Sequence, residues 1–83
     1  MRPADGTYRL IANPPDVFDV QGVVAGDTLT MSFGVLTWDA AHDWFASETP
    51  DVVIRCTGEG TFMAVWNHGQ PNQRAFEGTC IAV

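Results

Sequence analysis

The sequence predicts one small all-β domain, a six-stranded antiparallel barrel or sandwich. Apolar and polar residues alternate with a period of two, and turn-forming residues recur at intervals that suit short strands. The length of 83 residues leaves room for a single hydrophobic core, so the domain spans residues 1–83. Since 46% of the residues are apolar and only 17% are charged, the composition is that of a folded chain rather than a disordered one.

The alternation is clearest over residues 28–33, where Leu29, Met31 and Phe33 are expected to face the core. Clusters of Pro, Gly, Asn and Asp near residues 13–16, 25–27, 58–60 and 68–72 separate the expected strands, because these residues favour tight turns. The expected strands lie near 6–12, 17–24, 28–38, 51–57, 61–67 and 74–82. They group into two three-stranded meanders, 6–38 and 51–82.

Residues 39–46, between these meanders, do not follow the strand pattern. Asp39 is a suitable N-cap for a single helical turn, which would place Ala41 and Phe45 on one face. We therefore expect one short helical turn or a loop near 39–46.

The pattern also predicts how the last three strands pair. If residues 58–60 form a three-residue loop with Gly60 in the left-handed conformation, the apolar residues of neighbouring strands face one another. The expected pairs are Cys56 with Phe62, Ile54 with Ala64, and Val52 with Trp66. A two-residue loop would shift the register by one and bring Arg55 to the apolar side, so we prefer the longer loop.

The two cysteines lie, in this register, on strands that flank a common neighbour. Two strand spacings separate the Cα atoms of Cys56 and Cys80 by about 10 Å. A disulfide requires less than ~7 Å between these atoms. We therefore predict two buried free thiols, and the alternative is a disulfide in an exported domain whose last strand pairs differently.

The charge balance narrows the range of partners. The formal net charge is −6, with four Arg, no Lys, seven Asp and three Glu, and neither Arg nor Lys occurs between positions 10 and 54. Nucleic acids and anionic membranes bind cationic surfaces, so neither is expected as a partner. The acidic residues either keep the domain soluble or face a basic partner. No apolar leader follows Met1, which favours a cytoplasmic protein over an exported mature domain.

The segment from Trp38 to Phe45 is the strongest candidate for a binding site. Two Trp, one Phe, one His and two Asp fall within these eight residues. Aromatic residues on a connection between strands commonly anchor interfaces and ligand pockets. The alternative is that Trp38 and Phe45 complete the core as a lid on the barrel, while Trp44 fits either role. The binding residues predicted from the sequence are His42, Asp43, Trp44, Phe45 and His68.

The function that fits best is a non-catalytic binding domain that uses this aromatic and acidic segment. Its expected partner is a protein or a small apolar ligand, and a homodimer would cover two such surfaces at once. One alternative is a small enzyme with His42, His68, Asp39 and Asp43 as acid–base residues and Trp38 and Trp44 lining its pocket. A second is an acidic inhibitor that presents carboxylates to a basic partner. The two histidines lack metal-ligand spacing, and we expect neither a metal nor a cofactor.

Overall fold

The computed structural model describes residues 2–13, 19–48, 51–56 and 60–83. These residues form eight β-strands, and no helix occurs within the described ranges. The strands are β1 (Gly6–Ala12), β2 (Asp19–Ala25), β3 (Thr28–Met31), β4 (Gly34–Asp39), β5 (Trp44–Ala46), β6 (Val52–Cys56), β7 (Thr61–Trp66) and β8 (Arg74–Ala82).

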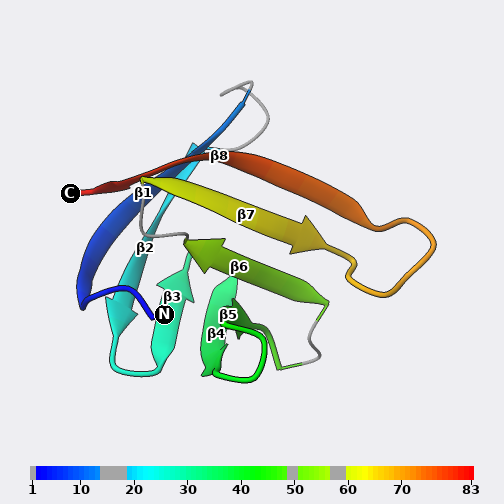
Figure 1. Cartoon of the computed structure of the whole chain (residues 1–83), viewed down its shortest axis with the longest axis horizontal. Helices are drawn as coiled ribbons and strands as arrows, with labels where there is room; N and C mark the ends of the chain where they lie inside the picture. The colour runs from blue at the N-terminus through cyan, green and yellow to red at the C-terminus, as the bar shows by residue number, and fades with distance from the viewer. Residues whose placement is uncertain (1, 14–18, 49–50, 57–59) are drawn as a thin grey trace.

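The eight strands form one closed antiparallel barrel in the order of the sequence. Figure 1 shows this meander running from blue β1 through green β4 to red β8. Pairing between β1 and β8 closes the barrel, so neither terminal strand of the meander leaves an unpaired edge. The prediction of an all-β antiparallel domain is confirmed. Of the two predicted architectures, a barrel or a sandwich, the structure has the barrel.

The predicted count of six strands is wrong, and one error lies in the segment 28–38. A turn at Ser32 and Phe33 splits this segment into β3 and β4, which pair through Met31 and Gly34. Leu29 and Met31 are buried as expected, but Phe33 lies in the turn and is 49% exposed. The turn also shifts the alternation by one residue, so Leu36 rather than Val35 is buried.

The other error lies in residues 39–46, which form a strand hairpin instead of a helical turn. The Asp39 side chain accepts a hydrogen bond from the backbone N–H of Ala41, as a helix N-cap would. Asp43 then adopts a φ of 58°, a left-handed conformation that reverses the chain into β5 instead of continuing a helix. β5 pairs with β4 and β6, which joins the two predicted meanders into a single one.

The predicted register of the last three strands is confirmed. Cys56 pairs with Phe62, Ile54 with Ala64 and Val52 with Trp66. Gly60 has a φ of 79°, as expected for the left-handed residue of this connection. The rest of the predicted loop, residues 58 and 59, lies outside the described residues, as does the turn at 14–16.

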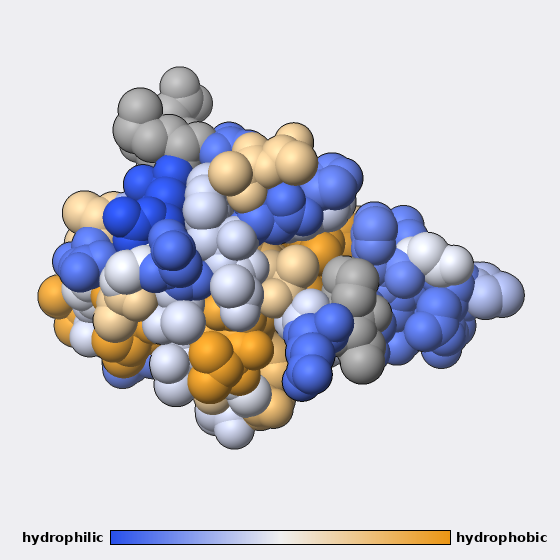
Figure 2. Space-filling view, turned by 90° about the horizontal axis from the view of Figure 1, so that it is seen from below, coloured by the Kyte–Doolittle hydropathy of each residue, from blue (hydrophilic) through white to orange (hydrophobic). Residues whose placement is uncertain are grey.

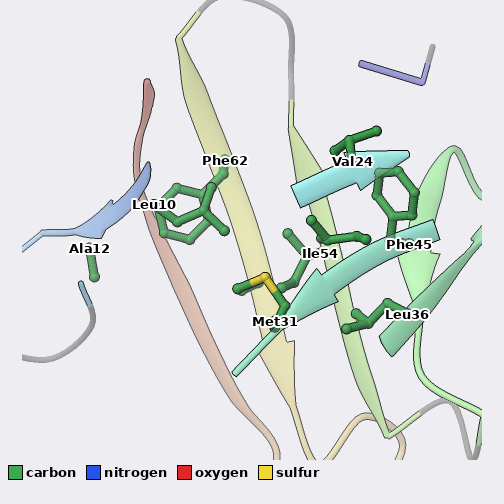
Figure 3. Close-up of a cluster of buried hydrophobic side chains, with 10 residues drawn as sticks. Leu10, Ala12, Val24, Met31, Leu36, Phe45, Ile54 and Phe62 are labelled. Atoms are coloured by element: carbon green, nitrogen blue, oxygen red, sulfur yellow. The ribbon is translucent and has the colours of Figure 1, made fainter. Parts of the chain in front are cut away.

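The interior of the barrel is filled by side chains that point inward from β1 to β7. Figure 3 shows Leu10 and Phe62 packed together, with Met31, Ile54 and Phe45 further along the same interior. The buried cluster consists of Leu10, Ala12, Val24, Leu29, Met31, Leu36, Phe45, Ile54, Phe62 and Ala64. The half-buried Trp38 and Trp66 pack against this cluster.

The geometry of the two cysteines differs from the prediction. They lie on β6 and β8, which flank β7 as expected, and both are free thiols. However, they are only half-buried, and their Sγ atoms are 3.0 Å apart. The estimate of ~10 Å treated the sheet as flat and compared Cα atoms. In a closed barrel the inward side chains of strands that flank a common neighbour converge, so the two sulfur atoms meet.

The connection between β7 and β8 forms a hydrophilic projection. Residues 68–73 are all exposed, and they extend to the right of the barrel in Figure 1. Figure 2 shows the same projection in blue, beside a body on which orange apolar patches alternate with polar ones. Among the described residues there is no helix long and apolar enough to cross a membrane.

Candidate functional site

The turn between β4 and β5 positions the candidate binding residues. Asp39 ends β4, and its backbone carbonyl accepts a hydrogen bond from the N–H of His42 at 3.3 Å. The Oδ1 atom of Asp39 accepts the N–H of Ala41 at 3.1 Å, so both acceptor groups of Asp39 hold the turn. This arrangement, followed by the left-handed Asp43, delivers Trp44 to the start of β5.

Trp44 lies on the outer face of the barrel because the next residue, Phe45, points into the core. The pairing of Phe45 with Ile54 places Trp44 beside Arg55 of β6, which also points outward. The Arg55 guanidinium lies 5.4 Å from the centroid of the Trp44 ring, within the range of a cation–π interaction. Trp44 is half-buried by its neighbours.

Two histidine rings also contact Trp44. The His42 ring stacks on it with a centroid distance of 4.8 Å and an interplanar angle of 10°. The His68 ring meets it edge-on at 5.4 Å and 78°. We refer to Asp39, His42, Trp44, Arg55 and His68 together as the Trp44 cluster.

Hydrogen bonds from Arg55 fix this cluster to the turn. Its Nε atom donates to the carbonyl oxygen of Asp43 at 3.1 Å, and its Nη2 atom donates to that of His42 at 2.5 Å. Arg55 therefore orders the backbone on which His42 is carried and, at the same time, lies against Trp44. A side-chain cluster held in this way loses little conformational entropy when a partner binds.

The outer face beside the Trp44 cluster includes two valines that are almost inaccessible to solvent. Val53 and Val65 pair with each other and alternate with inward-facing residues, yet they are 0% and 7% exposed. Neither belongs to the interior cluster. Both valines are therefore covered on the outside of the barrel, and the His68 ring meets Trp44 on the same outer face.

The structure brings together three of the five residues predicted as a binding site. His42, Trp44 and His68 join in the Trp44 cluster, and Asp43 contributes its carbonyl oxygen to Arg55. Phe45 does not belong to this surface, because it is 0% exposed and packs in the core, edge-on to Trp38 at 5.1 Å. Its burial agrees with the alternative interpretation of Phe45 as a residue that completes the interior.

Sequence reasoning did not identify Arg55 as a site residue. It placed this side chain on the outer, polar face of its strand, which is correct. The contact with Trp44 depends on β5, a strand of only three residues that the turn pattern did not predict.

The pKa of Asp39 provides a test of the geometry within the cluster. The hydrogen bond from His42 Nδ1 to Asp39 Oδ2, 2.7 Å long, lowers the pKa of this carboxyl below its ordinary value near 3.8. A carboxylate with a lowered pKa stabilises the fold above the pKa of the unfolded state, and this contribution is lost as the pH falls through the folded-state pKa. The Asp39–His42 pair is therefore expected to persist to a pH below 3.8 and then to break.

Carbon NMR titration of the side-chain carboxyl groups measures this shift directly. In the wild type we expect the midpoint for Asp39 to lie below 3.8, and in His42→Ala to rise to about that value. Asp19 is the control, since its pKa is lowered by Arg9, which lies 2.7 Å away and is not changed by the substitution. An unchanged midpoint for Asp39 in His42→Ala would mean that the hydrogen bond does not form in solution.

Neither histidine of the cluster lines either of the two pockets described at the ends of the barrel strands. Within the described ranges, no group of three His, Cys, Asp or Glu side chains is arranged to hold a metal ion. The fold and this site define a small up-and-down β-barrel with an aromatic cluster on its outer face. The chain has no significant match among family models, curated proteins or solved structures.

Proposed function

We propose that this chain is a non-catalytic binding domain and that the Trp44 cluster is its contact surface. The observation that carries the proposal is the outward-facing Trp44, held between two imidazole rings and a guanidinium group. Trp and Arg are the residues most enriched at the energetic centres of protein interfaces. Here both are fixed in place before any partner binds.

A protein partner suits this surface better than a small apolar ligand. The Trp44 cluster faces outward, and the His42 side chain is 60% exposed, whereas small-ligand sites are usually concave and largely enclosed. The simplest protein partner is a second copy of the chain. A two-fold dimer would cover two copies of the Trp44 cluster at once.

The acidic-inhibitor alternative has less support. Such a protein would present its carboxylates together on one face. Instead, Asp19 forms a salt bridge with Arg9, Asp27 lies 3.9 Å from Arg2, and Asp39 pairs with His42. These acids are distributed over different elements and are engaged within the chain.

The enzyme alternative rests on the Asp39–His42 pair, which has the distance of a carboxylate that orients a general base. Such a base needs a substrate held beside it. The face of His42 is stacked on Trp44, and the pair projects from an exposed turn rather than into either described pocket. We therefore prefer the binding domain.

Substitution of Trp44 by Ala tests this proposal. We expect Trp44→Ala to abolish self-association, measured by sedimentation equilibrium over a concentration series, and to abolish retention of protein partners from a lysate of the native host. The free energy of unfolding should fall by only about 1 kcal/mol, because the side chain lies outside the core. Loss of ~3 kcal/mol or more would instead assign Trp44 a core-like structural role.

Ile81→Ala is the matched control, since Ile81 is also an outward-facing apolar side chain, 46% exposed, but on β8. It should leave association and retention unchanged. If the wild type is monomeric and retains nothing that Trp44→Ala fails to retain, the Trp44 cluster is not a contact surface.

A further inference from the structure

Cys56 and Cys80 place two sulfur atoms together at the end of the barrel opposite the β7–β8 projection. Their Sγ atoms are 3.0 Å apart, closer than the about 3.5–4.0 Å at which non-bonded heavy atoms usually pack. A disulfide bond is about 2.05 Å long, so bond formation requires the sulfur atoms to approach by only ~1 Å. The two cysteines belong to β6 and β8, which do not pair with each other.

This pair is accessible from solvent. Both side chains are half-buried, and both line a pocket of about 540 Å³ together with Arg2, Tyr8, Gly60 and Ala82. Gly60 and Ala82, which line the same pocket, are small residues and leave space for part of a small disulfide to approach the sulfur atoms. A low-molecular-weight disulfide can therefore reach the sulfur atoms without unfolding of the barrel.

The contact between the two thiols distinguishes their chemical roles. The hydrogen bond from the Cys56 thiol lowers the pKa of Cys80, because it stabilises the Cys80 thiolate. The same contact, together with burial, raises the pKa of Cys56. Since the thiolate is the nucleophile in thiol–disulfide exchange, this direction of the two pKa shifts favours Cys80 for the first attack.

We propose that Cys56 and Cys80 form a reversible thiol–disulfide couple that cross-links β6 to β8. The oxidant is a low-molecular-weight disulfide, such as that of glutathione. The Cys80 thiolate attacks one of its sulfur atoms, the disulfide bond of the oxidant breaks, and one small thiol leaves. Cys56 then loses its proton and attacks the Cys80 sulfur atom, which releases the second small thiol. The protein loses two electrons and two protons, and the oxidant gains both. This proposal does not depend on the function of the Trp44 cluster.

Closure of the couple is expected to stabilise the barrel. The bond would join residues separated by 24 positions in sequence, which restricts the unfolded chain. For a loop of this size in a small domain we expect the melting temperature to rise by about 10 °C or more.

The experiment is equilibration of the purified chain in buffers of reduced and oxidised glutathione at fixed ratios. The protein is then quenched in acid, unfolded and alkylated, and its free thiols are counted by intact-mass spectrometry. We expect a transition from two free thiols to one intramolecular disulfide, reversed by dithiothreitol, with the higher melting temperature in the oxidised form. Two free thiols at every ratio, or stable glutathione adducts on both cysteines, would overturn the proposal.

Single serine variants test the order of attack. Cys56→Ser retains a hydroxyl donor beside Cys80 and should accumulate a mixed disulfide with glutathione. Cys80→Ser leaves Cys56, whose pKa is still raised by burial after the contact with Cys80 is lost, and should react several-fold more slowly. Circular dichroism of both variants establishes that the barrel is intact, so a slow reaction is not mistaken for misfolding. Equal rates, or faster reaction of Cys80→Ser, would contradict the assignment of Cys80 as the attacking residue.

Discussion

Phe45→Ala is expected to reduce the free energy of unfolding by about 3–5 kcal/mol, the usual cost of removing a buried Phe side chain. Phe45 is 0% exposed, pairs with Ile54 across β5 and β6, and lies edge-on to Trp38 at 5.1 Å. Domains of this size have a total stability of about 5–15 kcal/mol, so the substitution removes a large fraction of it. Urea unfolding monitored by circular dichroism at low temperature measures the change.

Phe33→Ala is the matched control because it removes the same side chain from a different environment. Phe33 lies in the β3–β4 turn, is 49% exposed, and contacts Trp66 at 5.6 Å. We expect a loss of about 1 kcal/mol or less. If Phe33→Ala destabilised the chain as much as Phe45→Ala, the turn at Ser32 and Phe33 would be misplaced, and the single long strand predicted from the sequence would be correct.

The two phenylalanines illustrate where the sequence pattern fails. Phe33 continues the alternation of Leu29 and Met31, so the pattern extends the strand straight through the turn. The next residues do not correct this error, because Val35 and Leu36 are both apolar and either one suits the core. Only the pairing of β3 with β4 selects Leu36. Such pairing is a tertiary contact that propensity and alternation do not encode.

The last three strands were predictable for the opposite reason. Gly60 marks a left-handed position, and each of these strands has one clearly apolar face. Only one register brings the apolar faces of neighbouring strands to the same side of the sheet. The two thiols of Cys56 and Cys80 are free as predicted, but the estimated Cα separation gave no indication that the two sulfur atoms meet. Strand spacing describes distances along a sheet, whereas the separation of inward side chains depends on the curvature of the closed barrel.

The candidate site was predictable in its aromatic residues but not in its geometry. Concentration of aromatic residues identified the segment, and Asp39 has a side chain that can start either a helix or a tight turn. The left-handed Asp43 decides in favour of the turn, and this conformation is not evident from residue type. Once β5 forms, alternation separates the buried Phe45 from the outward Trp44 and brings the latter to Arg55.

The contact that closes the barrel depends on a glycine. Gly78 of β8 pairs with Ala12 of β1, and a Cβ atom at Gly78 would lie 2.0 Å from the carbonyl oxygen of Ile11 and 2.7 Å from the Cα of Ala12. Both atoms belong to the backbone and cannot move without separation of the two strands. We therefore expect Gly78→Ala to reduce the free energy of unfolding by about 3 kcal/mol, the upper end of the usual cost of overpacking.

Gly22→Ala distinguishes this effect from a general intolerance of strand glycines. A Cβ atom at Gly22 would also be too close to its neighbours, at 2.3 Å from Met31 Sδ and 2.9 Å from Leu29 Cδ1. Those atoms are the ends of flexible side chains that can adopt other rotamers, so we expect a loss of only about 1 kcal/mol.

Hydrogen exchange shows which strand pairs of Gly78→Ala lose their backbone hydrogen bonds. In Gly78→Ala, the amides that join β1 to β8 should lose protection first, including that of Asn13, which donates to the carbonyl oxygen of Glu77 at 3.1 Å. The pairing of β6 with β7 lies away from the altered contact and should retain its protection in the same variant. Because β1 and β8 are the two ends of the meander, their separation would turn the closed barrel into an open sheet with two unpaired edges, which is also expected to aggregate. A Gly78→Ala variant as stable as Gly22→Ala, with the β1–β8 amides still protected, would mean that the barrel does not close through this pair of strands.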